Sequence, residues 1–377
     1  MKFQVNKDVL SEAVSFAVRI LPLKNKQQIL SGILIEADAN ALRFSVFDYE
    51  VSAQAEVVAK VEESGRILVS SKFLSDIAAR LPNAPVEFEA DGTKLLLMLL
   101  TCGSSKFTLP LMDVEAYPTL PELPAVNGTI SGDTFGDAVA QVAMAASKEE
   151  IPAWMTGVLI ETSPSQIAFT ATDRYRVALK EIDWTSNTTG DLSALVPAKT
   201  LQEIAKTFAN QPEISIAIKS DEERGMIAFK ANNRSVTTQL IKDAARPVRG
   251  YFPSTTDNFS IVATQDLIDS TRRVALVLDK QPALKYSFSD SSVQLEANES
   301  AQASENVSAE LTGKEIVVML KPQFLIDALG ACHTEFVKIA FTNNENPHKP
   351  GPVLITGHGA KDKADSFKYL LQPNLLR

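Results

Sequence analysis

The side chains best suited to chemistry in this sequence are its few histidines and cysteines. The 377 residues contain His333, His348 and His358, together with Cys102 and Cys332. Such residues bind metals or act as nucleophiles when they occur in close pairs or beside a base. No histidine has a partner at metal-ligand spacing, and the two cysteines lie far apart in the chain. The sequence therefore predicts no metal site, and it favours a reduced, cytoplasmic protein.

Asp173 can be read as a carboxylate with a tuned pKa, because Arg174 and Arg176 follow it closely. A hydrolase that pairs Asp173 with a histidine is one hypothesis. The interpretation we favour is an aspartate in a turn, flanked by arginines at the surface. The sequence contains no GxGxxG, GxxxxGK[ST], GxSxG or HExxH motif. These absences disfavour an enzyme and predict no cofactor.

Composition and charge restrict the remaining classes of protein. Hydrophobic residues make up 45% of the chain and charged residues 22%, which is typical of a globular protein, and the length predicts two or three domains. No apolar stretch is long enough to cross a membrane, and the amino terminus does not resemble a signal peptide. The net charge of -9 argues against a protein that grips nucleic acid through bulk positive charge.

The sequence repeats itself, and the repeat predicts which elements position any site. A short strand and an amphipathic helix begin at residue 3 and recur near residues 129 and 260. A second helix follows in each copy, over 71–81, 198–209 and 321–329, with alternating strand segments between the two helices. A turn residue closes one strand in each copy at an interval of about 125, as Asp48, Asp173 and Asn298.

We therefore predict an α+β fold of three similar domains, each with two helices packed on antiparallel sheets. Proline-rich segments near residues 117–124 and 251–254 place the domain boundaries at 1–124, 125–253 and 254–377. The predicted helices carry more Lys and Arg than Asp and Glu, while the rest of the chain is acidic. A mildly basic helical face would let a phosphate backbone pass without being gripped, although Lys and Arg are also common on any solvated helix.

Several segments resemble the bacterial sliding clamps, the β subunits of replicative DNA polymerase III. The resemblance covers the whole chain, and the segments that carry it are Met1-Lys2-Phe3, Met155-Thr156-Gly157-Val158-Leu159, Ala171-Thr172-Asp173-Arg174-Tyr175-Arg176-Val177-Ala178, Val196-Pro197-Ala198-Lys199 and Tyr369-Leu370-Leu371-Gln372-Pro373. It implies a homodimer that closes head to tail into a ring, with helices lining the hole and double-stranded DNA threaded through it. Such a clamp is non-catalytic and confers processivity on the polymerase. The alternative is a three-domain interaction scaffold that does not bind DNA.

The resemblance also implies partners and a groove that binds them. The partners are the polymerase III α subunit, the clamp loader, and repair polymerases, ligase and mismatch-repair proteins, all docked through linear peptides. The matching groove residues lie in the second and third domains: Met155, Thr172, Arg174, Tyr175, Arg176, Val177, Pro247, Tyr251, Leu370, Gln372, Pro373 and Asn374. Met155, Val177, Leu370 and Pro373 are expected to form an apolar pocket, with Thr172 and Arg176 as polar donors at its rim.

The same resemblance assigns DNA-facing and dimer-interface residues. Lys24, Lys148 and Lys199 match positions that face the hole. At the interface, Lys72, Phe107 and Leu109 of one chain are expected to meet Leu276 and Val277 of the other. The chain departs from the family pattern in two places: residues 244–251 lack the usual Phe-Pro pair, and the tail carries the polar residues Gln372 and Asn374. We therefore expect a different peptide preference.

Overall fold

The computed structural model describes residues 1–21, 27–90, 97–220, 225–279, 283–298, 301–342, 350–359 and 366–375. Contacts group the chain into two compact units. The first contains residues 1–136, 184–196 and 200–240, and the second contains residues 137–183, 197–199 and 241–377. The predicted mixture of helices and antiparallel strands is confirmed.

Each predicted helix is present, and the residues at its start explain where it begins. The helices are α1 (Lys7–Arg19), α2 (Ser71–Ala78), α3 (Gly132–Ala143), α4 (Ala198–Phe208), α5 (Thr264–Val274) and α6 (Pro322–Ala331). The Asn6 side chain accepts a hydrogen bond from the Asp8 amide at 2.9 Å and caps α1. Pro322 lies in the first turn of α6, where its missing N–H costs no helical hydrogen bond. Short 3-10 helices are η1 (Gln28–Ser31), η2 (Val114–Ala116), η3 (Ala153–Thr156), η4 (Arg249–Tyr251) and η5 (Ala275–Val277).

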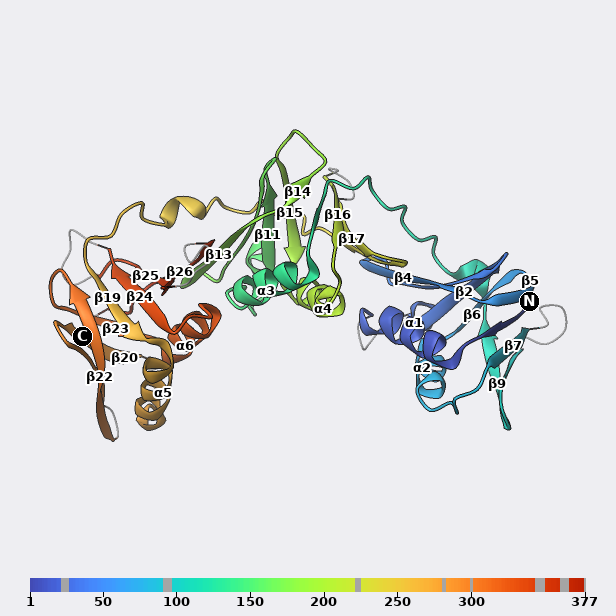
Figure 1. The fold of residues 1–377 in the computed structure, drawn as a ribbon, viewed down its shortest axis with the longest axis horizontal. Coiled ribbons are helices and arrows are strands. Elements are labelled where there is room, and N and C mark those ends of the chain that lie inside the picture. The colour runs from blue at the N-terminus through green and yellow to red at the C-terminus, as the bar shows by residue number, and fades with distance from the viewer. Residues whose placement is uncertain are drawn as a thin grey trace. The chain divides into compact units, whose positions relative to one another are not determined.

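The first unit is built on one long antiparallel sheet (Figure 1). Its strands run in the order β14-β10-β16-β17-β18-β4-β3-β2-β6-β9-β8-β7-β1-β5. Their bounds are β1 (Lys2–Val5), β2 (Gly32–Asp38), β3 (Ala41–Phe47), β4 (Val51–Val58), β5 (Lys60–Glu63), β6 (Gly65–Ser70), β7 (Val86–Ala90), β8 (Leu97–Cys102), β9 (Ser105–Met112), β10 (Gly128–Ile130), β14 (Thr185–Ser186), β16 (Ile214–Lys219), β17 (Met226–Ala231) and β18 (Arg234–Gln239). Helices α1 and α2 contact one another, and α1 packs against β3 and β4.

The second unit repeats this design. Its strands run in the order β11-β12-β13-β26-β25-β24-β19-β22-β21-β20-β23. Their bounds are β11 (Gly157–Thr162), β12 (Gln166–Thr172), β13 (Arg176–Asp183), β19 (Phe259–Ala263), β20 (Leu284–Ser289), β21 (Ser292–Asn298), β22 (Gln302–Thr312), β23 (Ile316–Leu320), β24 (Phe336–Phe341), β25 (Val353–His358) and β26 (Phe367–Leu371). Helices α5 and α6 pack together, and α5 covers β21 and β22. Strand β15 (Leu192–Pro197) completes the described elements.

Alternation along the strands explains which face of each sheet is buried. In β7, Val86 and Phe88 are buried while Glu87 and Glu89 are exposed, so successive side chains point to opposite faces. The Phe88 ring stacks on Phe3 of the neighbouring strand β1, with ring centroids 4.5 Å apart. Burying such aromatic pairs is a large part of what stabilises these sheets.

Each sheet continues from one repeat of the sequence into the next. In the first unit, β4 pairs with β18, so Ser52 lies opposite Thr237. In the second unit, β13 pairs with β26, so Val177 lies opposite Leu370. We call these places the first and second junctions. Main-chain hydrogen bonds join neighbouring repeats at both.

Burial of Cys332 predicts a loss of stability at alkaline pH. Cys332 is 8% exposed, and burial raises the pKa of its thiol to about 12, opposed only in part by nearby Lys180. Above the ordinary pKa of 9.0 the thiol ionises in the unfolded chain, whereas it stays protonated in the folded chain. The free energy of unfolding is therefore unaffected by this group below pH 9, and it falls as the pH rises from 9 to 12. We expect the Cys332→Ala variant to lose less stability than the original chain between pH 8 and 11, by about 2 kcal/mol. Urea unfolding at both pH values measures this; equal losses would contradict it.

Candidate functional site

The second junction carries an open pocket of about 500 Å³. Its floor combines Val177 of β13 and Leu370 of β26, which lie opposite one another in the sheet. Val248 packs on both residues, and all three are less than 10% exposed. The lining residues are Trp154, Met155, Thr172, Arg174, Tyr175, Arg176, Val177, Arg246, Val248, Tyr251, Pro352, Leu370 and Gln372. The pocket is therefore an apolar hollow shared by two repeats of the sequence.

The rim of the pocket is polar and aromatic, and it is accessible. Tyr175 is 53% exposed and Tyr251 is 62% exposed, and Arg174, Arg246 and Gln372 are also exposed. Large exposed aromatics around an apolar floor are typical of surfaces that bind a partner through a few anchors. The η4 helix positions Tyr251, and the Gln372 amide is fixed by a 2.8 Å hydrogen bond to the Tyr175 carbonyl oxygen.

The turn that leads into the pocket is an Asx turn, as the sequence predicts. Asp173 Oδ1 accepts hydrogen bonds from the Tyr175 and Arg176 amides, each at 3.1 Å. Arg174 has a φ of 79°, in the left-handed region that the turn requires. The carboxylate of Asp173 is thereby committed to holding the loop, which favours the structural interpretation over an acid or base.

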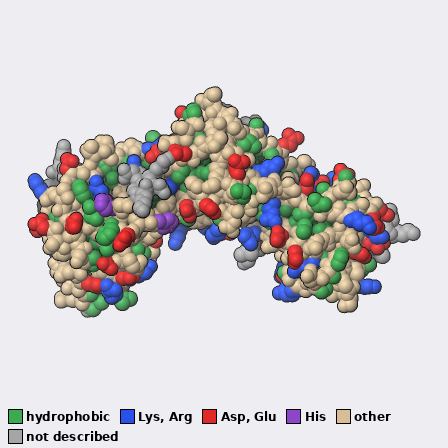
Figure 2. Space-filling model, in the orientation of Figure 1, with side chains coloured by type: hydrophobic (Ala, Val, Ile, Leu, Met, Phe, Trp, Pro, Cys, Tyr) green, Lys and Arg blue, Asp and Glu red, His purple; other side chains and the backbone are tan. Residues whose placement is uncertain are grey.

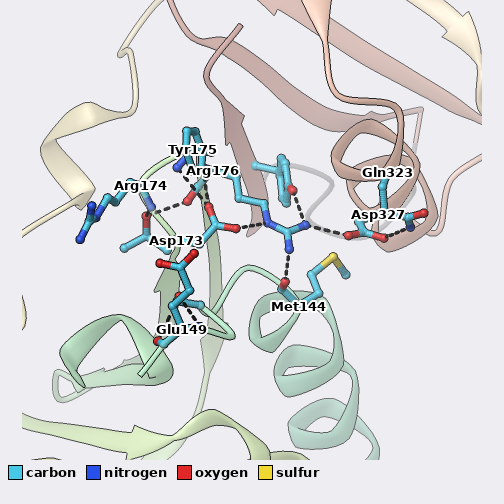
Figure 3. A network of polar contacts seen from close by, with 11 residues as sticks. Met144, Glu149, Asp173, Arg174, Tyr175, Arg176, Gln323 and Asp327 are labelled. Atoms are coloured by element: carbon cyan, nitrogen blue, oxygen red, sulfur yellow. Dashed lines mark hydrogen bonds and ion pairs between the residues drawn. The ribbon is translucent and has the colours of Figure 1, made fainter. Parts of the chain in front are cut away.

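Arg176 is buried, which corrects the expectation that it is a surface arginine and a donor at the rim. Its guanidinium bonds Asp173 Oδ2 at 2.9 Å through Nε, and Asp327 Oδ2 at 2.7 Å and Tyr369 Oη at 3.1 Å through Nη1 (Figure 3). Nη2 donates to the Met144 carbonyl oxygen at 2.6 Å. Arg176 is 6% exposed. Its guanidinium joins the second repeat, through Asp173 and Met144, to the third repeat, through Asp327 and Tyr369.

The electrostatics of this network keep Arg176 charged. Burial disfavours the charged guanidinium, but the Tyr369 hydroxyl and the carboxylates of Asp327 and Asp173 outweigh it and raise the pKa of Arg176 above its ordinary value. Burial in turn raises the pKa of the Tyr369 phenol well above its usual range. The cation and its partners therefore form a fixed ionic cluster beneath the pocket.

Thr172 is also not free to act as a donor at the rim. Its hydroxyl donates to the Arg176 carbonyl oxygen at 2.7 Å and accepts from the Arg174 amide at 3.3 Å. The side chain is 6% exposed. Thr172 therefore shapes the turn and offers mainly its methyl group to the pocket.

A second hollow of about 360 Å³ adjoins the first and shares Met155, Arg174, Tyr175 and Arg176 with it. Lys321 and the rings of Tyr175 and Phe324 are among its lining residues. Lys321 Nζ lies 4.2 Å from the Tyr175 ring centroid and 5.0 Å from that of Phe324. Ile151, which is 83% exposed, lies at its edge. The two hollows together make an elongated surface suited to an extended ligand.

The structure brings together nine of the twelve residues predicted for the groove: Met155, Thr172, Arg174, Tyr175, Arg176, Val177, Tyr251, Leu370 and Gln372. The other three do not line the pocket. Pro247 is exposed between two lining residues, Pro373 is buried, and the Asn374 amide donates to the Met319 carbonyl oxygen at 2.8 Å.

Trp154, Arg246, Val248 and Pro352 line the pocket but are absent from the prediction. Trp154 could have been found as the neighbour of Met155. Arg246 and Val248 flank the predicted Pro247. No signal in the sequence indicates Pro352.

The remaining predicted residues are placed as follows. Lys148 and Lys199 are exposed, the latter in the first turn of α4, and Lys24 lies outside the described residues. Lys72 of α2 is exposed and Phe107 of β9 is half-buried, whereas Leu109 is 7% exposed and offers little surface. Leu276 is 82% exposed and Val277 is half-buried, both in η5. In Figure 2, Lys and Arg side chains are interspersed with Asp and Glu across the visible surface.

The side chains that could hold a metal ion are dispersed in the described part of the chain. Within the described ranges, no group of three or more His, Cys, Asp or Glu side chains is placed to hold a metal ion. Neither hollow has a histidine or cysteine among its described lining residues. No helix in the described residues is long and apolar enough to cross a membrane.

Comparison with known proteins places these features in one family. Three family models match successive parts of the chain. They describe the N-terminal, central and C-terminal domains of the DNA polymerase III β subunit, and they match residues 1–121, 129–247 and 249–360. The matches cover most of the chain and follow the repeats described above.

Individual relatives agree with the family models. The chain is 39% identical to a β sliding clamp of Streptomyces coelicolor over 380 residues, covering 99% of both chains. It is 41% identical to a β sliding clamp of Micrococcus luteus over 313 residues, covering 83% of this chain and 99% of the relative. The crystal structure of a DNA polymerase sliding clamp from Bacillus subtilis superimposes with a TM-score of 0.90 at 24% identity, covering 100% of both chains. The predicted three-domain clamp fold is confirmed.

Proposed function

This chain belongs to the DNA polymerase III β subunit family, the sliding clamps, and we propose that it encircles double-stranded DNA and tethers the replicative polymerase to it. The observation that carries the tethering role is the open apolar pocket at the second junction, with its exposed aromatic rim. A processivity factor needs no reaction of its own, so we propose a non-catalytic protein without a cofactor. The alternative scaffold that never meets DNA is not favoured, because the models of all three clamp domains match the chain in order and cover most of it.

The proposed ring is a homodimer, and two free strand edges support it. In β9, residues 105–110 pair with β8 on one side only, since just Leu111 and Met112 pair with β6. In β22, residues 302–308 pair with β21 alone, whereas residues 309–312 pair with β19. These statements concern the described residues. A head-to-tail contact that joins β9 of one chain to β22 of the other would cover both edges and continue the sheet.

Side chains beside these edges fit the same contact. Phe107 lies on β9, and Leu276 lies in η5, directly after α5, which packs on β22. Glu305 of β22 is already bonded to Arg273 of the same chain, and Glu296 to Lys285. Because both glutamates already have a partner in their own chain, we do not propose that they form ion pairs with the other chain. We propose that apolar contacts and strand pairing hold the dimer.

The partners proposed for the pocket are linear peptides of the polymerase III α subunit, the clamp loader, and repair polymerases, ligase and mismatch-repair proteins. An apolar floor with a rim of aromatics and cations suits a short peptide that has apolar anchors and acidic or polar flanks. The proposed domain boundaries remain 1–124, 125–253 and 254–377, and the proposed location is the cytoplasm, where such partners work.

Removing one exposed aromatic from the rim should weaken peptide binding without affecting the fold. We expect Tyr251→Ala to weaken binding of a polymerase α-subunit peptide about 30-fold, because an aromatic side chain that the peptide covers contributes about 2 kcal/mol. Fluorescence anisotropy of the labelled peptide measures the effect. Tyr49→Ala is the matched control, since Tyr49 is 52% exposed, belongs to the first unit and is not among the lining residues of the pocket. Equal affinity for both variants would show that the pocket is not the peptide site.

Topological retention tests the DNA role directly. When loaded onto nicked circular DNA by a clamp loader, the protein should stay bound as the salt concentration rises and should leave when the circle is cut. Phosphate contacts weaken steeply with salt, and a ring held by topology does not depend on them. Lys148 and Lys199 are proposed to face the DNA. Gel filtration of the DNA with labelled protein distinguishes the outcomes, and equal retention on linear DNA would contradict encirclement.

A further inference from the structure

The first junction repeats the architecture of the second almost residue for residue. The elements η1, β3 and β4 correspond to η3, β12 and β13 with an offset of 125 at both ends. In the first junction, β4 begins after the turn at Asp48 and pairs with β18. In the second junction, β13 begins after the turn at Asp173 and pairs with β26. The first junction therefore has the framework of a peptide pocket.

The turn geometry is the same in both places. Asp48 Oδ1 accepts from the Glu50 amide at 3.0 Å and the Val51 amide at 2.8 Å, as Asp173 does from the equivalent amides. Tyr49 has a φ of 76°, close to the 79° of Arg174. The Gln239 amide donates to the Glu50 carbonyl oxygen at 2.8 Å, which matches the bond from Gln372 to Tyr175.

The two junctions differ in what fills them. The position of Thr172 is taken by Phe47, which packs with Leu34, Leu68 and Tyr117 into a buried cluster. Tyr117 comes from the segment that follows β9, and it is 8% exposed. The Phe47 amide donates a hydrogen bond to the Tyr117 hydroxyl at 2.7 Å. Burial raises the pKa of Tyr117 to about 12.

Neighbouring residues of the same segment complete the filling. Val114 and Leu120 pack against the cluster together with Ile29, which stands at the position of Trp154. Val114, Tyr117 and Leu120 thus present three apolar anchors at intervals of three residues. The floor differs as well: the pair Val177 and Leu370 is replaced by Ser52 and Thr237, whose hydroxyl oxygens are 2.6 Å apart and hydrogen-bonded to each other.

We propose that the first junction is a second peptide site whose permanent occupant is the chain's own segment 113–124, anchored by Tyr117. This inference rests on the proposed function of the second junction, where the segment after β18 contributes Val248 to the wall and the pocket beside Thr172 is open to partners. The occupied site explains why one chain would bind one partner peptide although it contains two similar junctions. It also gives the segment a role in holding the first junction together.

The experiment removes the anchor and supplies the segment in trans. The probe is a synthetic peptide with the sequence of residues 113–124, titrated by calorimetry into the full-length Tyr117→Ala variant. We expect one new site with an affinity at least tenfold higher than for the original chain. Tyr117→Phe is the matched control, since its ring still fills the junction, and it should gain no site. A photoactivatable leucine at the position of Leu120 in the probe should crosslink near Phe47.

Folding and the rest of the proposal are checked separately. If Tyr117→Ala does not fold, Tyr117→Leu, which keeps part of the packing, should show a smaller gain. Binding of the polymerase α-subunit peptide should be unchanged in both variants because the second junction is untouched. A folded variant that binds the probe no better than the original chain would overturn the inference. Failure of the original chain to bind the polymerase peptide would instead overturn the proposed function.

Discussion

Replacing Arg176 by methionine is expected to lower the free energy of unfolding by about 3–5 kcal/mol and to weaken peptide binding at the second junction. Methionine keeps an unbranched apolar stem but removes the cation that Asp173 and Asp327 share. Removing one partner of a buried ion pair leaves the other charges without compensation, which is far more costly than losing a surface pair. The Tyr369 hydroxyl and the Met144 carbonyl oxygen would also lose their donor.

Arg174→Met is the control for this prediction. Arg174 lies in the same turn but is exposed, so its replacement should change stability by no more than about 0.5 kcal/mol. Urea unfolding of the two variants and the original chain compares the midpoints. Similar midpoints for Arg174→Met and Arg176→Met would mean that the ionic cluster does not stabilise the junction.

A single charge at Leu276 is expected to convert the proposed dimer into monomers. Leu276 is 82% exposed in the single chain, so Leu276→Glu should fold normally. In the dimer the same carboxylate would be buried without a partner, and we expect dimerisation at least about 100-fold weaker, equivalent to about 3 kcal/mol. Sedimentation velocity across a range of protein concentrations measures the change.

Val58→Glu provides the comparison, because Val58 is 79% exposed and lies outside the proposed contact. It should leave the dimer intact and show that an added surface charge alone does not dissociate it. A dimer that survives Leu276→Glu would place the interface elsewhere. Loss of topological retention on circular DNA should accompany the monomers, since a half ring cannot encircle a duplex.

The secondary structure and the repeat could be predicted because both are local signals in the sequence. Hydrophobic periodicity marks α2 and α4, and the interval between Asp48 and Asp173 aligns two turns that the structure shows to be equivalent. Most of the pocket could be predicted because the segments that resemble the sliding clamps, chiefly those around β13 and at the end of β26, carry its residues.

The contacts between distant segments could not be predicted in the same way. Arg176 looks like a surface arginine in the sequence, and its burial depends on Asp327 and Tyr369, which lie far along the chain. Pro352 lines the pocket through the pairing of β25 with β26. Tyr117 looks like a linker residue, and only the folded chain shows that it fills the first junction. Tertiary packing, rather than propensity, decides each of these positions.

The shared floor of the pocket links ligand binding to the mechanics of the chain. Val177 and Leu370 lie on opposite sides of one ladder of main-chain hydrogen bonds, so bending at that ladder changes the distance between them. A peptide that rests on both residues must therefore resist the bend, and by reciprocity a bent chain must bind the peptide less well. A bound peptide therefore stiffens the second junction. The affinity measured at this pocket in turn reports how far the second junction is bent.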